Sequence, residues 1–83
     1  MEIGTAVFIR TVTYHYTGRV LAKDDGFVTL GDAAWIADSG RFARALSDGT
    51  LNEVEPYPDQ VQVALSAIVD VSPWQHDLPR RTK

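Results

Sequence analysis

Short runs typical of strands, separated by turn signals, recur along this chain, and they limit what it can fold into. Residues 6–12, AVFIRTV, are rich in β-branched and aromatic side chains, a composition typical of a strand. Residues 16–23, YTGRVLAK, alternate between two faces, and an Asp-Gly hairpin signal separates them from FVTLGD at 27–32. The chain therefore begins with three predicted strands in a meander, with the first turn near residues 13–15.

The pattern changes to a helical one only once, before it returns to strands. Asp38 or Ser39 can cap a helix that Gly49 would end, so we expect a helix over about residues 38–48. The acidic connection after it contains two prolines and allows only a brief edge strand at 53–55, before two final strands at 61–65 and 67–74. Five main strands, the last two nearly continuous, predict an all-β fold: a small five-stranded barrel with one short α-helix inserted after the third strand.

The length of the chain, 83 residues, allows one domain. We expect this domain to cover residues 1–76 and a flexible basic tail to follow at 77–83. A chain this short buries a modest core, and the absence of cysteine removes disulfides and thiolate metal sites as stabilising devices. Self-association is the remaining common solution, so a homo-oligomer is expected. No metal site or cofactor is predicted, since the only two histidines, His15 and His76, lie far apart in the sequence.

Charge and hydropathy narrow the choice of partners and location. No apolar run approaches the roughly 18 residues that a membrane span needs, and the N-terminus lacks the pattern of a signal peptide, so we expect a cytoplasmic protein without membrane contact. The net charge is −3, and the basic residues of the tail are Arg80, Arg81 and Lys83. Without these three, 5 basic residues stand against 11 acidic ones. This excess of acidic residues argues against binding of long nucleic acids, which requires a cationic surface.

Residues 16–33, YTGRVLAKDDGFVTLGDA, resemble the first motif of the Sm-like family of small barrel proteins. The residues that carry this resemblance are Tyr16, Gly18, Val20, Asp24, Val28, Leu30, Asp32 and Ala33. The closing VQVALSAIVDV is similar to the second motif of that family in its two-strand form only. The resemblance implies an Sm-like or SH3-like barrel, in which Gly18 lets a strand bend and Asp32 accepts backbone hydrogen bonds at a strand end.

The residues by which RNA-binding members of that family resemble one another are absent. Their loop resembles D-x-F-M-N and an Arg-Gly joins their last strands, whereas this chain has DDGFVT in the loop and Leu65-Ser66 at the join. This difference argues against a single-stranded RNA ring. The segments FIRTVTYHYTGRV, DAAWIADSGRF and EVEPYPD also resemble small uncharacterised proteins of tailed bacteriophages. That resemblance implies a phage context, and for a phage-encoded protein the cytoplasm expected above would be that of the host cell.

The stretch TVTYHYTGR, residues 11–19, carries the strongest signal for ligand binding. Aromatic faces hold nucleobases by stacking, and arginines on neighbouring strands can clamp a phosphate. The predicted ligand-binding residues are Arg10, Thr13, Tyr14, His15, Arg19 and Trp35. The alternative for these positions is structural: half-buried rings, a solvated histidine in the turn, and arginines paired with acidic residues across strands.

Trp35 and Phe42 have a second interpretation, as the centre of a subunit interface, where tryptophan is enriched. Trp35 could instead anchor the helix to the barrel. No enzyme is predicted, because the sequence lacks a cysteine nucleophile, a serine elbow motif, a set of metal ligands and a glycine-rich phosphate loop.

The predicted function is non-catalytic binding of a small nucleotide-like anion by a homo-oligomer. A phage protein that sequesters a host immune signalling nucleotide would be one such case. Two alternatives remain open. One is a structural or adaptor protein of a virion with protein contacts only, and the other is an atypical RNA-binding Sm-like protein.

Overall fold

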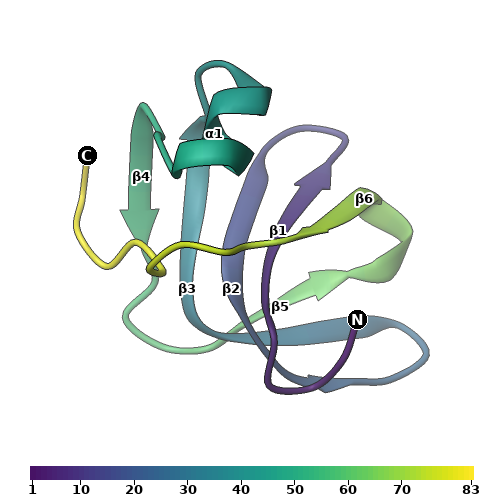
Figure 1. Cartoon of the computed structure of the whole chain (residues 1–83). Coiled ribbons are helices and arrows are strands. Elements are labelled where there is room, and N and C mark those ends of the chain that lie inside the picture. The colour runs from purple at the N-terminus through teal and green to yellow at the C-terminus, as the bar shows by residue number, and fades with distance from the viewer.

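The computed structural model describes all 83 residues and consists mostly of strands with one short helix (Figure 1). The elements follow one another as β1 (Ala6–Thr11), β2 (His15–Lys23), β3 (Phe27–Asp38), α1 (Phe42–Asp48), β4 (Glu53–Pro56), β5 (Val61–Ala64), a turn of 3-10 helix (Leu65–Ala67) and β6 (Ile68–Pro73). The mostly β character and the single helix are as predicted. The sheet has six strands rather than five, because the brief edge segment expected at 53–55 forms the separate strand β4.

All paired strands are antiparallel, and they form one open sheet. The strand order is β4-β3-β2-β1-β6, and β5 pairs with β3 beside this path. The long strand β3 pairs with both β4 and β5. Its residues 27–30 pair with β5, and its residues 34–38 pair with β4. No ladder joins β6 to β4 or β5, so the pairing does not show the closed barrel that the sequence predicted.

The sheet bends sharply where the ladder between β2 and β3 is irregular. Its register shifts between Thr17 and Arg19, so that Gly18 faces two residues of β3 across a bulge. A Cβ atom at Gly18 would lie 2.9 Å from the Cβ of Leu30. The two strands can therefore approach this closely only because position 18 is glycine, in agreement with the bend expected there.

The core consists of two apolar clusters, and β1 contributes to both. The first cluster contains Val7, Ile9, Val20, Val28, Leu30, Ala33 and Val63. The second contains Phe8, Ala34, Ile36, Ala45, Leu51, Val54 and Trp74. Because successive residues of a strand point to opposite faces, β1 is buried on both sides. Its Phe8 face is covered by α1 and by the chain that follows β6.

The helix α1 begins at Phe42, later than the predicted start near residue 38. Asp38 stays in β3 opposite Glu53, and its carboxylate accepts a hydrogen bond from the N–H of Gly40 (2.8 Å). No side chain caps the helix start, which corrects the expected cap at Asp38 or Ser39. The helix ends as predicted at Gly49, which has a φ of 78°. No helix in the protein has the length and apolar character that crossing a membrane requires.

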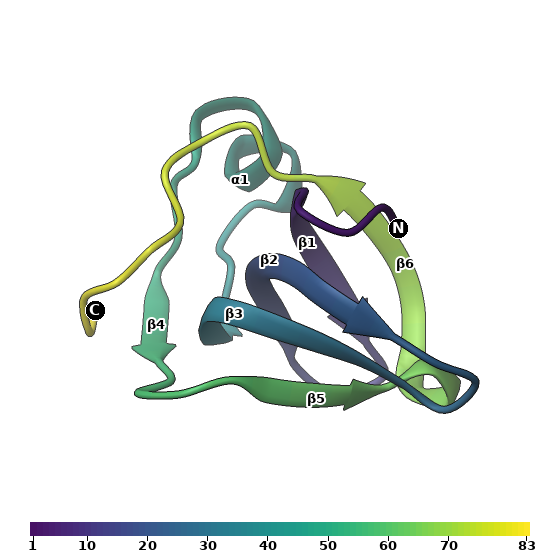
Figure 2. The same cartoon turned by 90° about the horizontal axis from the view of Figure 1, so that it is seen from below.

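The segment after β6 crosses the molecule and docks beside β4 (Figures 1 and 2). Leu78 packs against the second core cluster, and the Nε1–H of Trp74 donates to the carbonyl of Asp77 (3.1 Å). Lys83 and Val54 exchange two backbone hydrogen bonds of 2.9 and 3.0 Å. Residues 77–83 thus have partners in the body of the domain, and burial of Leu78 and pairing with a strand edge oppose the cost of ordering them. The flexibility expected of this tail stays a prediction.

Candidate functional site

The six predicted ligand-binding residues do not form one site. Arg10 pairs with His15 at the turn end of the β1–β2 ladder, whereas Arg19 pairs with Ala6 at its other end. Trp35 belongs with the first group, because its ring contacts that of Tyr14. The sequence therefore identified two arginines on neighbouring strands correctly, but the structure places them at opposite ends of the ladder.

Arg10 is neutralised within the chain. Its guanidinium donates two hydrogen bonds from Nε to the carboxylate of Asp70 (2.9 and 3.1 Å), and a further one from Nη2. The hydrogen bond from Arg10 lowers the pKa of Asp70, and the ring of Phe42 lies 4.3 Å from the guanidinium carbon. For Arg10, the structure supports the alternative of a cross-strand ion pair over a phosphate clamp.

The rings of the Tyr14-His15-Tyr16 stretch pack against neighbouring rings. Tyr14 lies 4.6 Å from Trp35 between ring centroids, and His15 packs on Phe8 at 5.5 Å in an edge arrangement. Burial, followed by the charge of Arg10, lowers the pKa of His15. Thr13 is an exposed turn residue whose N–H donates to the hydroxyl of Thr11 (3.4 Å). None of the three surface hollows of the protein is lined by the predicted residues of this end.

The two predicted interface residues make contacts inside the chain. Phe42 is half-buried, with its ring 5.8 Å from that of Phe8. Trp35 is also half-buried, but it lies within β3 opposite Tyr16 and Glu55 rather than at the start of the helix. The idea that Trp35 anchors the helix is therefore not supported. A subunit interface at either residue stays a prediction.

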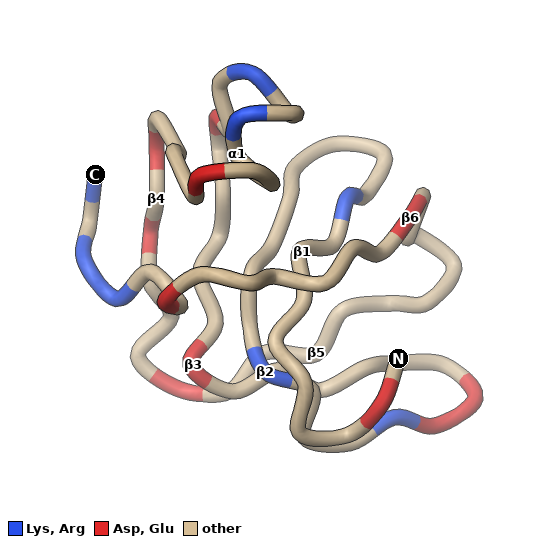
Figure 3. The backbone as a smooth tube through the Cα atoms, viewed as in Figure 1, with Lys and Arg blue, Asp and Glu red and all other residues tan.

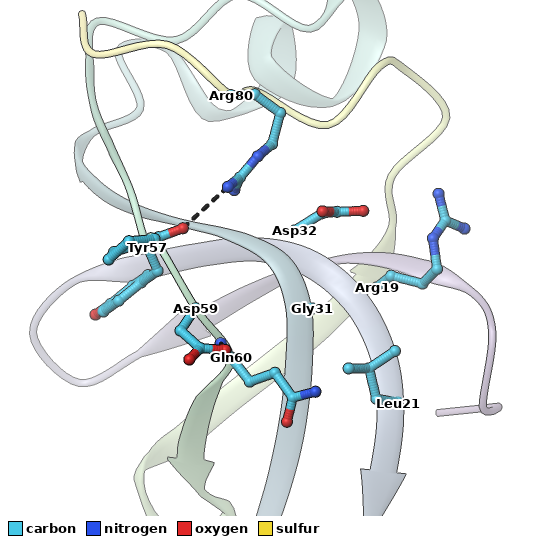
Figure 4. Close-up of a pocket in the computed structure, with 9 residues that line it drawn as sticks. Arg19, Leu21, Gly31, Asp32, Tyr57, Asp59, Gln60 and Arg80 are labelled. Carbon is cyan, nitrogen blue, oxygen red and sulfur yellow. Dashed lines mark hydrogen bonds between the residues drawn. The ribbon is translucent and has the colours of Figure 1, made fainter.

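Arg19 lines a surface hollow of about 300 Å³, which we call the Arg19 hollow (Figure 4). Three segments far apart in the sequence form it: the bulge of β2 and β3, the connection between β4 and β5, and the C-terminal segment. The lining residues are Arg19, Leu21, Gly31, Asp32, Tyr57, Pro58, Asp59, Gln60 and Arg80. Of these, only Arg19 was a predicted site residue. The others could not be assembled from sequence patterns, because no local signal connects residues 31, 59 and 80.

Arg80 connects the C-terminal segment to two other parts of the chain by hydrogen bonds. Its two terminal nitrogens donate to the carbonyls of Ala33 (2.7 Å) and Tyr57 (2.9 Å), and Figure 4 shows the second of these bonds. A guanidinium has five N–H groups, so three of them have no hydrogen-bond partner within the chain. Arg80 is therefore held in one orientation before any ligand arrives.

Arg19 and Asp32 carry opposite charges in the same hollow without forming an ion pair. The only ion pairs of the protein are Arg10–Asp70 and Arg44–Asp48. Arg19 makes a single hydrogen bond, to the carbonyl of Gly4 (3.1 Å). Asp32 is exposed and has a φ of 47°, the only positive value of a non-glycine residue. Its carboxylate accepts no hydrogen bond, so the strand-end role expected for it is not observed.

The remaining polar groups of the hollow are largely engaged. Asp59 accepts a hydrogen bond from the N–H of Gln60 (2.8 Å). The ring of Tyr57 stacks on that of Tyr16 with 6.3 Å between centroids and points away from Arg19 (Figure 4). Burial and the neighbouring Tyr16 raise the pKa of Tyr57, which keeps its hydroxyl protonated. Leu21 offers the exposed apolar surface of the hollow, with the residue 39% exposed.

No protein-family model, no curated protein and no solved structure matches this chain. The resemblances to Sm-like and phage-encoded proteins therefore stay predictions. The function has to be argued from the site itself. The protein contains no group of three or more His, Asp or Glu side chains placed to hold a metal ion.

Proposed function

We propose that the protein is a non-catalytic binding protein for a small nucleotide-like anion, held between Arg19 and Arg80. One observation carries this proposal: Arg19 lies in a hollow with Arg80 and is not paired with a carboxylate. Guanidinium groups match the geometry of phosphate oxygens and bind them by two parallel hydrogen bonds. The guanidinium of Arg10, in contrast, already forms an ion pair with the carboxylate of Asp70.

The size and charge of the hollow favour one small molecule over a polymer. A volume of about 300 Å³ lies at the lower end of the range for small-molecule sites. Polymer binding relies on many phosphate contacts along a basic surface, whereas Lys and Arg are scattered over this chain among acidic residues (Figure 3).

The proposal extends to fold family, assembly and biological role. The strong bend of the meander at Gly18 supports an Sm-like or SH3-like barrel. The strands β5 and β6 each have only one partner, and an unpaired strand edge can pair with a second copy of the chain. Stoichiometric binding without catalysis would suit a phage protein that sequesters an immune signalling nucleotide in the host cytoplasm.

Thermal unfolding in the presence of linear and cyclic nucleotides tests the proposal, with the mass of the oligomer measured in the same samples. A nucleotide that binds the native state alone stabilises it by about 2.7 kcal/mol at 100 times its dissociation constant. We expect a selective shift for the wild type and its loss in Arg19→Gln. The matched control is Arg41→Gln, which removes an exposed arginine outside the hollow. Absence of any shift in the well-folded protein would overturn the proposal.

A structural or adaptor protein of a virion is the second candidate, favoured by exposed apolar side chains. Val12 is 77% exposed, Tyr14 46% and Val69 59%, and such side chains mark contact surfaces where they are contiguous. This candidate predicts no nucleotide shift and a loss of self-association in Val69→Ser. An atypical RNA-binding role predicts instead that binding to oligonucleotides weakens steeply with salt.

A further inference from the structure

The backbone at Asp32 directs a carboxylate into the Arg19 hollow. Asp32 lies in the bulge opposite Gly18, and bulges re-aim side chains and are frequent beside binding sites. Its positive φ of 47° is one that aspartate and asparagine tolerate better than other non-glycine residues. The neighbouring peptide is fixed, because Ala33 is fully buried and its carbonyl is bound by Arg80.

The carboxylate of Asp32 is free to accept hydrogen bonds, unlike most aspartates of this protein. Five others accept hydrogen bonds from their own loops or from arginine: Asp24, Asp38, Asp48, Asp59 and Asp70. Asp32 has no such partner, and Figure 4 shows its carboxylate on the side of the hollow that faces Arg19. An ionised carboxylate accepts hydrogen bonds but donates none. A ligand that contacts Asp32 must therefore present N–H or O–H groups to it.

The charged groups of the hollow together describe a ligand with an anionic group and a donor edge. In the view of Figure 4 the Asp32 carboxylate lies between the guanidinium groups of Arg80 and Arg19. A guanidinium beside it suits the phosphate, and Asp32 suits two adjacent N–H groups on the base. Guanine presents such a pair on its Watson–Crick edge, from its ring N1–H and its exocyclic amino group. The corresponding edge of adenine places an acceptor nitrogen beside its amino group, and the lone pair of this nitrogen would face a lone pair of the carboxylate with no proton between them.

We infer that Asp32 makes the Arg19 hollow selective for guanine nucleotides over adenine nucleotides. The inference rests on the proposed nucleotide binding and adds the class of base. Asp32 acts here as a residue that determines specificity, while the arginines supply the attraction for phosphate. A buried or partly buried pair of hydrogen bonds to one base edge discriminates against the wrong base by about tenfold or more.

Isothermal titration with guanosine monophosphate and adenosine monophosphate tests the inference on the full chain. We expect the wild type to bind the guanine nucleotide at least about tenfold more tightly. Asp32→Asn should reduce that ratio to about twofold or less, because the amide turns one acceptor into a donor. Loss of the negative charge should leave binding of the adenine nucleotide equal or stronger. Asp25→Asn, which removes the same charge from the exposed hairpin turn, should keep the wild-type ratio.

The outcomes separate the inference from the proposal on which it rests. Equal binding of both nucleotides by the wild type, abolished in Arg19→Gln, would keep the proposed function and overturn the selectivity. No binding of either nucleotide by the folded protein would overturn both. Asp32→Gly provides a second variant, since glycine adopts positive φ without strain. A guanine preference that survives in both Asp32 variants would also overturn the inference.

Discussion

The two ends of the β1–β2 ladder each carry an arginine, and the surroundings of the two arginines are opposite. At the turn end, Arg10 is bound by Asp70 of β6 and lies against Phe42 of α1. At the other end, Arg19 projects into a hollow and bonds to one backbone carbonyl. One end uses its arginine to hold elements of the fold together, and the other leaves the same chemical group available to a ligand.

The two arginines differ because different elements pack against the two ends of the β1–β2 ladder. β6 and α1 both pack over the turn end, so that charge and aromatic surface there find partners within the chain. At the Arg19 end, Asp32 of the bulge is exposed, and the segments around the hollow leave it open. The comparison teaches that an arginine in a strand is a candidate ligand-binding residue when no carboxylate of a neighbouring element forms an ion pair with it.

The largest expected effect is on the free energy of unfolding. It appears when one apolar side chain is truncated on each side of the comparison. Phe8 is fully buried against rings of His15, Phe42 and Trp74. Phe8→Ala should lower the free energy of unfolding by about 3–5 kcal/mol. Leu21→Ala, in the wall of the Arg19 hollow, should change it by about 0.5 kcal/mol, since that side chain is partly exposed. Urea unfolding measures both, and similar losses would contradict the comparison.

The next effect concerns the arginines themselves. Arg10→Gln should lower the midpoint of thermal unfolding by a few degrees, because it leaves Asp70 without its partner and removes the contact with Phe42. Arg19→Gln should leave the midpoint almost unchanged in the absence of ligand, since it removes one exposed hydrogen bond. Scanning calorimetry of the two variants decides the matter. A larger loss for Arg19→Gln would mean that its role is structural.

Thr17 lies on β2 between the two ends of the ladder. A substitution there should have a smaller effect, and it should stabilise the protein rather than destabilise it. Its hydroxyl is fully buried and has no hydrogen-bond partner, and such an unsatisfied group carries a desolvation cost. Thr17→Val, which keeps the shape, should raise the free energy of unfolding by about 1 kcal/mol. The same urea titration measures this. A destabilised Thr17→Val protein would indicate that the hydroxyl has a partner that the structure does not show.

The smallest effect is a pH dependence confined to the turn end. The pKa of His15 is lowered in the folded protein, so the unfolded chain binds a proton first as the pH falls below about 6.5. Stability should therefore decrease from that pH downward until it passes the folded pKa. The lowered pKa of Asp70 predicts a second loss at more acidic pH, below about 3.9. Urea midpoints at pH 7 and 5 should differ less in His15→Gln than in the wild type, and an equal difference would contradict this assignment.

Part of the candidate site could be predicted from sequence, and the missing part has a physical explanation. Arg19 was found because it lies next to a stretch rich in rings and hydroxyl groups. Arg80 was assigned to a flexible tail, because short-range patterns do not reveal that Leu78 reaches a core cluster or that Lys83 pairs with β4. Asp32 was assigned to a strand end, since the bulge that re-aims it depends on the register between β2 and β3.

The sequence by itself determined the features that depend on neighbouring residues. Composition, alternation and the Asp-Gly turn signal specified the meander of β1, β2 and β3. The hairpin forms where Asp-Gly lies, and the Asp24 carboxylate accepts hydrogen bonds from the N–H groups of Gly26 and Phe27. The stop at Gly49 was equally local, since only a residue that tolerates positive φ suits that position.

Only the tertiary structure decided how far β3 extends, which arginine is neutralised and which residues meet in the hollow. The segment DAAWIAD has no strict alternation, yet it is strand because β2 and β4 supply backbone partners on both of its edges. Arg10 and Arg19 differ in the same way, since Asp70 lies 60 residues from Arg10 along the chain. Such partners are brought together by packing of the whole sheet, which no local pattern encodes.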